Sequence, residues 1–338
     1  MPALPPQTIT SDAGPVPTDV SLAPALPGAA EALEAEPGRF PIGLRYMAGS
    51  ALFFSVMSML VKVASDRGLP AMEIVLVRCA VMTVLTALLA RAAGASIAGN
   101  DKRTLFGRGF VGAAALSLFY LALGRLPLGD ATALHYTAPM WTAALAAPLL
   151  GERPGRALLA ALALSGAGVV LVTRPALLFG GAPLDTVGVA AALAGAILSG
   201  LAYVSVRKLR ATDHPLTVVF WLSWVGVLIA LPFAIAGWVT PSPLDWLLLI
   251  AVGLTTHVAQ VFMTRGLHLE TAGRAVAVGY LQVMFAFLWG WAVFGAEPTI
   301  LGLLGASLVV ASTLFLGWAP TVSRSQWCVR GAKRDPPR

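Results

Sequence analysis

The chain has 338 residues, of which 57% are hydrophobic and 12% are charged, with a mean hydropathy of +0.80. A soluble domain carries roughly a quarter charged residues, and a soluble core stops growing at about this length, so the composition excludes a single soluble globular domain. The net charge of +7 does not indicate a nucleic-acid partner, because the basic residues fall in short loops between apolar runs. The two cysteines, Cys79 and Cys328, exclude a disulfide framework and give no support to a metal site.

Residues 1–42 are rich in proline and acidic residues and lack apolar periodicity, which predicts a disordered N-terminal tail. Ten apolar runs follow, each near the ~20 residues that cross a bilayer as a helix. We place them at 43–64, 71–91, 106–124, 128–150, 156–173, 186–206, 215–237, 244–264, 272–294 and 298–318. The run 128–150 is the least regular, because Asp130, His135 and Pro139 interrupt it. A basic tail, 319–338, ends the chain.

The placement of Lys and Arg predicts the orientation in the membrane. With the N-terminus inside, 18 of the 23 fall in inner segments, and we count Arg108 among them. Only Arg67, Arg125 and Arg174 fall in outer loops. Under the positive-inside rule, this bias predicts a multi-pass protein of the cytoplasmic (inner) membrane with both termini in the cytoplasm.

An internal repeat divides the chain into two halves of five spans, 43–173 and 174–318. A shift of 144 residues places Tyr136 on Tyr280, Met140 on Met284, Gly151 on Gly295 and Pro154 on Pro298, and a shift of 145 places Lys62 on Arg207 and Pro70 on Pro215. Because five is odd, the second half enters the membrane from the opposite side. Such inverted repeats are common in secondary transporters, whose binding site lies near the midplane between the halves. Compositional coincidence is the alternative in an Ala- and Leu-rich chain.

Three segments resemble the EamA-like branch of the drug/metabolite transporter superfamily. They are GDATALHYTAPMWTAALAAPLLGERP (129–154), its counterpart VGYLQVMFAFLWGWAVFGAEP (278–298), and PAMEIVLVRCAVMTVL (70–85) with its Pro, Glu and Arg pattern. The resemblance covers about residues 43–318 and implies a ten-span fold with both ends inside and a central cavity. It does not fix the substrate. In GAEP the acid Glu297 stands one place later than Glu152 in GERP, which departs from strict equivalence.

The aromatic and methionine side chains of two spans predict the substrate-binding site. Tyr136 and Met140 are four residues apart and share one face of a continuous helix, as do Tyr280 and Met284. With Trp141, they would form aromatic, adaptable walls on opposite sides of a central cavity. Ordinary helix packing is the alternative for each of these residues.

A polar stripe on the eighth span includes His257 and Gln260, with Thr256 and Thr264 at helical spacing. Lipid cannot satisfy these groups, so the stripe should face a cavity or another helix. His257 is a candidate proton site because histidine titrates near neutral pH, and a structural hydrogen bond is the alternative.

Lys62, Glu73 and Arg78 are ionisable residues within the first two spans. If they meet, they form a charge cluster on the outer side, which is either a gate or substrate contact or a structural ion pair.

The sequence contains no phosphate-binding Gly-rich loop with Lys and no zinc-protease or nucleophile motif, so we expect neither a cofactor nor a bound metal.

The sequence as a whole predicts a secondary transporter for a small organic metabolite or drug. We predict an exporter, and the alternative is an importer of a planar vitamin- or nucleoside-like compound. The remote alternative is an intramembrane enzyme using His135 or His257 with Asp130. The expected partners are the substrate and the lipid bilayer, with protons as the candidate coupling ion. Monomer and homodimer both stay open.

Overall fold

The computed structural model describes residues 41–319, except 124, 127, 153, 174, 175, 180–183 and 296–298. Within these residues the chain forms helices and no strand, as predicted. The helices are α1 (Ile42–Asp66), α2 (Ala71–Ala92), α3 (Lys102–Leu123), α4 (Leu128–His135), α5 (Ala138–Leu150), α6 (Arg156–Thr173), α7 (Ala176–Phe179), α8 (Thr186–Leu209), α9 (Pro215–Ala236), α10 (Pro243–Leu269), α11 (Ala272–Val278), α12 (Leu281–Phe294) and α13 (Ile300–Trp318). Nearly all of the two predicted tails, residues 1–40 and 320–338, lies outside the described residues.

Eight of the described helical segments are long and apolar enough to cross a membrane. They are α1, α2, α6, α8, α9, α10, α13, and α11 with α12 taken as one segment. These eight match eight of the ten predicted runs, and the remaining two runs correspond to α3 and to α4 with α5. Large apolar side chains such as Val84, Leu88 and Phe233 are exposed on the surface, where a bilayer would cover them. The chain is a polytopic helical membrane protein, and the count of ten spans stays a prediction.

Two of the predicted spans are broken near their middles. Pro139 has no N–H to donate to the carbonyl of His135, and α4 ends at His135 while α5 begins at Ala138. The second break separates α11 from α12 at Gly279 and Tyr280. There the N–H of Gly279 donates to the Val276 carbonyl at 2.9 Å. This bond spans three residues, as in a 3₁₀-helix, and not the four residues of an α-helix. Under the 144-residue shift, the two breaks fall within one residue of each other.

The helix ends follow from local sequence signals. The Asp185 carboxylate accepts from Gly188 N at 2.8 Å at the start of α8, and Ser242 with Asp245 forms a capping box at the start of α10. Gly151 and Gly295 end α5 and α12 in the left-handed conformation, with φ of +69° and +65°. These two glycines are also related by the 144-residue shift.

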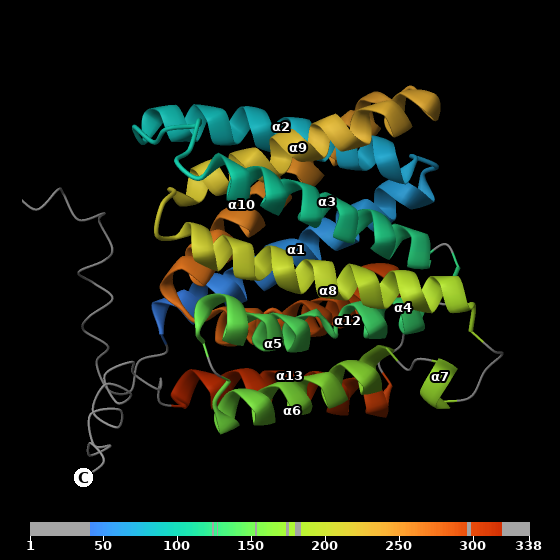
Figure 1. Cartoon of the computed structure of the whole chain (residues 1–338). Coiled ribbons are helices and arrows are strands. Elements are labelled where there is room, and N and C mark those ends of the chain that lie inside the picture. Colours follow the sequence, from blue (N-terminus) through green and yellow to red (C-terminus); the bar gives the residue numbers. More distant parts are fainter. Residues whose placement is uncertain are drawn as a thin grey trace, which may run out of the picture. The chain divides into compact units, whose positions relative to one another are not determined.

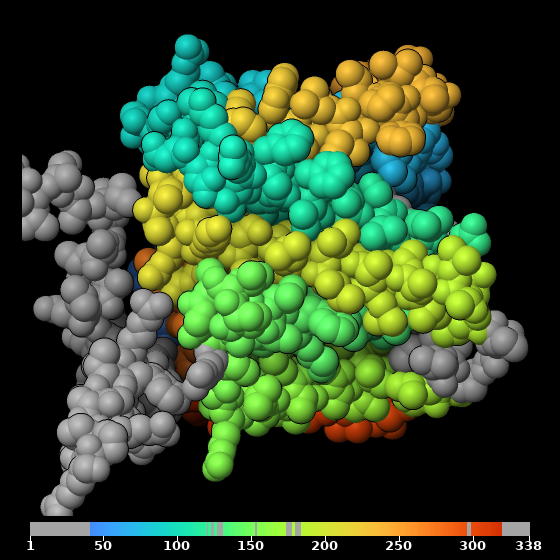
Figure 2. Space-filling view, in the orientation of Figure 1, coloured from blue at the N-terminus to red at the C-terminus, as the bar shows by residue number. Residues whose placement is uncertain are grey.

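The helices pack mainly in four pairs: α1 with α10, α3 with α8, α6 with α13, and α2 with α9. In Figure 1, α2 and α9 lie at one edge of this helical unit and α6 and α13 at the other, with α1, α3, α8 and α10 between them. On the face drawn in Figure 2, α3, α8, α5 and α6 follow one another from the first edge toward the second. The largest cluster of buried apolar residues includes Leu44, Leu209, Leu267 and Tyr280, so the main core lies where α1, α8, α10 and the break before α12 meet.

Candidate functional site

Tyr136 and Tyr280, one at each helix break, are in contact. Their rings stack with centroids 6.1 Å apart and planes inclined by 29°. The Tyr280 hydroxyl donates a hydrogen bond of 2.8 Å to the Tyr136 carbonyl oxygen. Tyr280 is 1% exposed, and Tyr136 is partly buried beside the main core. Two residues that the repeat predicts to be equivalent therefore touch each other.

The break after α4 is what makes the Tyr136 carbonyl available. In a continuous helix the N–H of Met140 would donate to that carbonyl. Here the Met140 N–H donates to Thr137 O at 2.9 Å, so the Tyr136 oxygen has no partner in its own helix. A carbonyl buried without a partner is costly, and the phenol of Tyr280 supplies the missing donor.

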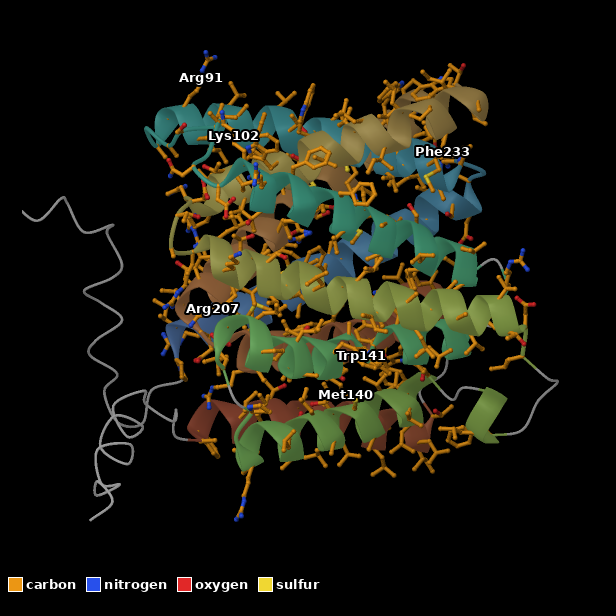
Figure 3. The ribbon with its side chains drawn as sticks, viewed as in Figure 1. Arg91, Lys102, Met140, Trp141, Arg207 and Phe233 are labelled. Carbon is orange, nitrogen blue, oxygen red and sulfur yellow. The ribbon has the colours of Figure 1, made fainter. Side chains whose placement is uncertain are left out.

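Met140 and Trp141 lie away from the tyrosine pair. They are 42% and 38% exposed, and with Leu193 of α8 they line a groove of about 280 Å³. Figure 3 shows both side chains on the near face of the molecule. Residues four apart share a helix face only when the helix is continuous. Because the helix breaks after His135, Tyr136 and Met140 do not share one. Tyr136 and Met284 pack against the main core that contains Tyr280, so Met140 is the one member of the two Tyr–Met pairs that lies apart from it.

A third tyrosine, Tyr203 of α8, packs against the same core as the pair, and a buried arginine lies on the far side of it. Arg108 is inside α3 and only 4% exposed, which corrects its assignment to an inner segment outside the span. Arg108 interacts electrostatically with Tyr203 of α8, and Tyr203 in turn interacts with Tyr136. Arg108 was not predicted as a site residue because it was counted with the inner basic residues, although it stands inside the run 106–124.

His257 is 3% exposed and its tautomer follows from its neighbours. Thr86 Oγ1 donates its only hydrogen to Met82 O at 2.6 Å, and His257 Nδ1 lies 3.1 Å from the same Oγ1. Nδ1 must therefore carry the hydrogen and donate it to Thr86, which leaves the Nε2 lone pair as an acceptor. Nε2 has no hydrogen-bond partner among the described residues, and His257 lines a cavity of about 490 Å³ together with Phe262 and Arg265. Gln260, one turn on, also has a buried oxygen, Oε1, without a described partner.

The three residues of the predicted charge cluster do not meet. Lys62 pairs with Asp66 one turn further along α1, and both side chains are exposed. Glu73 is fully buried and accepts from Val239 N at 3.0 Å, while Arg78 Nε has no partner within the described part of the chain. An acid at i+4 on the same helix is a nearer partner for Lys62 than one on another helix.

A different charged network ties four helix ends together at the opposite end of α1. Arg207 Nε donates to Glu152 Oε1 at 2.9 Å, and Glu152 Oε2 accepts from Ala272 N, in the first turn of α11, at 2.8 Å. Arg207 Nη1 also donates to the carbonyls of Leu267 and His268, where α10 ends. Figure 3 shows Arg207 on the same side as Arg91 and Lys102. Glu152 is part of the GERP segment, and no local sequence pattern predicts its partners.

No group of three or more His, Cys, Asp or Glu side chains that could hold a metal ion occurs among the described residues. The chemistry that these residues offer is hydrogen bonding, one buried cation and aromatic surface. This arrangement suits noncovalent binding of a small molecule.

The sequence model of the EamA-like transporter family matches this chain twice, at residues 41–174 and 186–318. The chain belongs to that family. The resemblance noted in the sequence is thereby confirmed, and so is the prediction of a transporter. This EamA-like protein is a multi-pass membrane transporter, and the comparisons favour neither the importer nor the enzyme alternative.

Relatives of the chain agree with this family. It is 34% identical over 264 residues to the pseudopaline exporter CntI of Pseudomonas aeruginosa, covering 78% of this chain and 91% of that protein. It is 32% identical over 295 residues to solute carrier family 35 member G1 of Mus musculus, covering 80% of this chain and 77% of that protein. A solved crystal structure superposes with a TM-score of 0.71 at 19% identity, over 86% of this chain and 98% of the other, so the two share a fold.

Proposed function

We propose that this EamA-like transporter exports a small organic metabolite across the cytoplasmic membrane by alternating access between two inverted five-helix halves. The observation that carries the proposal is the contact of Tyr136 with Tyr280. When equivalent residues of two repeats touch, the contact lies on the axis that relates the repeats. In transporters built from inverted repeats, the substrate site lies at that axis near the midplane.

Packing contacts recur between the halves in support of the repeat. A Cβ added to Gly109 of α3 would come within 2.9 Å of Val225 Cβ on α9, and one added to Gly253 of α10 would come within 2.6 Å of Val81 Cβ on α2. Gly253 and Val225 stand 144 residues after Gly109 and Val81, respectively. The same close helix approach thus occurs once in each half, with its two members exchanged.

The pairs α1–α10 and α8–α3 are related in the same way. Ser50 Oγ of α1 donates to the Ala259 carbonyl of α10 at 2.9 Å. A Cβ at Gly195 of α8 would lie 3.2 Å from the Ala115 carbonyl oxygen of α3. Gly195 is the 145-residue mate of Ser50, and Ala259 is the 144-residue mate of Ala115. Together with the double match of the family model, these contacts support halves at 43–173 and 174–318.

The proposed topology has ten spans, with α3 and the α4–α5 pair added to the eight apolar segments. The basic end, where α1 begins and Glu152 meets Arg207, faces the cytoplasm under the positive-inside rule. In the conformation described, the partly buried Glu152–Arg207 pair joins α5, α8, α10 and α11 at this end. Opening toward the cytoplasm requires that this pair separate.

Protons are the proposed coupling ion, and His257 is the proposed carrier. Its Nε2 lone pair is buried, and Arg265 is the charged side chain in the lining of the same cavity of about 490 Å³. Water entering this cavity would bring protons to Nε2. The Thr86 hydrogen bond holds the ring in the tautomer that accepts them.

The direction of transport can be tested without knowing the substrate. Cells that express the protein are compared with cells that express Tyr136→Ala at equal membrane level, by untargeted mass spectrometry of cells and medium. An exporter enriches at least one metabolite in the medium and depletes it inside the cells. The name of the relative CntI supports this direction, and enrichment inside the cells would overturn it.

A further inference from the structure

Arg108 is a buried cation without an anion. Its side chain is 4% exposed, and its guanidinium forms no hydrogen bond or salt bridge with any described residue. A buried charge is costly unless it is paired, and an ionisable group inside a membrane span marks a functional site by default. The missing partner of Arg108 therefore requires an explanation.

The guanidinium is directed into the protein, away from the near helix end. A Cβ added to Gly112, one turn after Arg108 in α3, would lie only 2.4 Å from Nη1 and 3.3 Å from Leu222 of α9. Helical side chains normally lean toward the N-terminus, and an arginine that snorkels to water near the start of α3 would do so. Arg108 runs the opposite way, into space that exists because residue 112 has no side chain.

The cation is connected to the proposed substrate site through tyrosines. Arg108 interacts electrostatically with Tyr203, and both Tyr203 and Tyr280 interact with Tyr136. Arg108 on α3 is thus next to Tyr203 on α8, and Tyr203 packs against the same core as the tyrosine pair at the two helix breaks. Guanidinium recognises planar oxyanions through paired hydrogen bonds, and aromatic rings bind the apolar part of a ligand.

We infer that Arg108 binds the anionic group of the transported molecule, so that the substrate class is organic anions carrying a carboxylate or phosphate. The body of the anion lies against Tyr203 and the Tyr136–Tyr280 pair. The inference rests on the proposed function, since it completes the site at the repeat axis. It also explains the missing partner, because the substrate supplies the negative charge.

The test uses the purified full-length transporter and pairs of probes that differ only in charge. The pairs are indole-3-acetate with indole-3-acetamide and benzoate with benzamide, and inorganic phosphate is the probe for the anion alone. Binding is measured as ligand-induced thermal stabilisation over a concentration series. The variants are Arg108→Gln and Arg108→Lys, with Arg103→Gln as the matched control, since Arg103 is an exposed arginine on the same helix.

The wild-type protein should bind at least one carboxylate more tightly than its amide. Arg108→Gln should weaken that carboxylate about 10- to 100-fold and the amide less than threefold, as expected for a hydrogen bond to a charged group. Without ligand, Arg108→Gln should melt at the same or a higher temperature, because an unpaired buried charge has been removed. Arg108→Lys should retain part of the preference, and Arg103→Gln all of it. Binding of phosphate but neither carboxylate would assign the anion to the phosphate class.

The inference is overturned if the wild type prefers no anion, or if Arg108→Gln keeps the preference. It is also overturned if Arg108→Gln melts lower and Arg108→Lys restores the melting temperature, because the charge is then structural. If Arg108→Gln does not fold, Gly112→Ala keeps the charge and displaces the guanidinium, and it must still reduce the carboxylate preference. Tyr136→Ala should weaken carboxylate and amide alike. If Tyr136→Ala weakens the binding of neither ligand while Arg108→Gln abolishes the preference for the carboxylate, the proposed tyrosine site is wrong and the anion site is retained.

Discussion

Replacing Tyr280 with Phe tests whether the contact between the two helix breaks holds the centre of the protein together. The substitution removes the hydroxyl that donates to the Tyr136 carbonyl at 2.8 Å and keeps the ring that stacks on Tyr136. A hydrogen bond between membrane helices contributes about 0.6–2 kcal/mol, and a buried carbonyl left without a donor costs about 1–3 kcal/mol. We expect Tyr280→Phe to lower the free energy of unfolding by about 1–2 kcal/mol. Tyr280→Ala, which also loses the stacking and leaves a cavity, should lower it by about 3–5 kcal/mol.

Unfolding of the purified protein in mixed micelles measures these free energies, and flux in proteoliposomes is measured in parallel. Tyr46→Phe is the matched control, because Tyr46 packs edge-on against Phe262 and its hydroxyl has no hydrogen-bond partner among the described residues. It should change the free energy of unfolding by less than about 0.5 kcal/mol. If Tyr280→Phe is as mild as Tyr46→Phe, the hydroxyl does not stabilise the break and the reasoning is refuted.

Three further predictions concern the charges, the proton site and the topology. Glu152→Gln and Arg207→Gln should each destabilise the protein by about 1–3 kcal/mol, and the double variant should recover part of that loss in a double-mutant cycle, whereas additive losses would show no coupling. His257→Gln should abolish the dependence of flux on a proton gradient between about pH 5 and 8 while leaving gradient-free exchange intact, and a retained dependence would exclude His257 as the carrier. Arg67→Cys should react with an impermeant thiol reagent in intact cells and Arg103→Cys should not, and the reverse pattern would invert the proposed orientation.

The helices could be predicted from the sequence because each depends on neighbouring residues. Run length, prolines near the ends and glycine after the last turn set most of the boundaries. Pro139 was noted as an interruption of the run 128–150, but the run was still predicted as one span, and the break there was not. The second break, at Gly279 and Tyr280, has no proline and shows only as the repeat equivalent of the first.

The binding residues were harder to predict because they depend on how helices meet. The structure separates Met140 from Tyr136, because helical spacing does not survive the break between the two residues. Tyr136 and Tyr280 do touch, and under the proposed repeat this is expected, because equivalent positions can meet at its axis whatever the local helix geometry is. The partners of Glu152 lie on α8 and α11, more than 50 residues away, and no local pattern signals them.

Arg108 shows where the repeat stops applying. Its neighbour Gly109 has an equivalent in Gly253, and the two glycines make the same close helix contact in each half. The residue equivalent to Arg108 is Val252, which is fully buried in an apolar cluster.

In alternating access between inverted halves, each half takes up in one state the conformation that the other half has in the opposite state. The contacts that pack the helices are therefore expected to occur in both halves. In the proposed mechanism the substrate site is presented to both sides in turn, so one arginine would serve both states. A second buried cation at Val252 would add a desolvation cost without a second anion to offset it. The scaffold is therefore expected to be symmetric where helices pack, and asymmetric where the substrate binds.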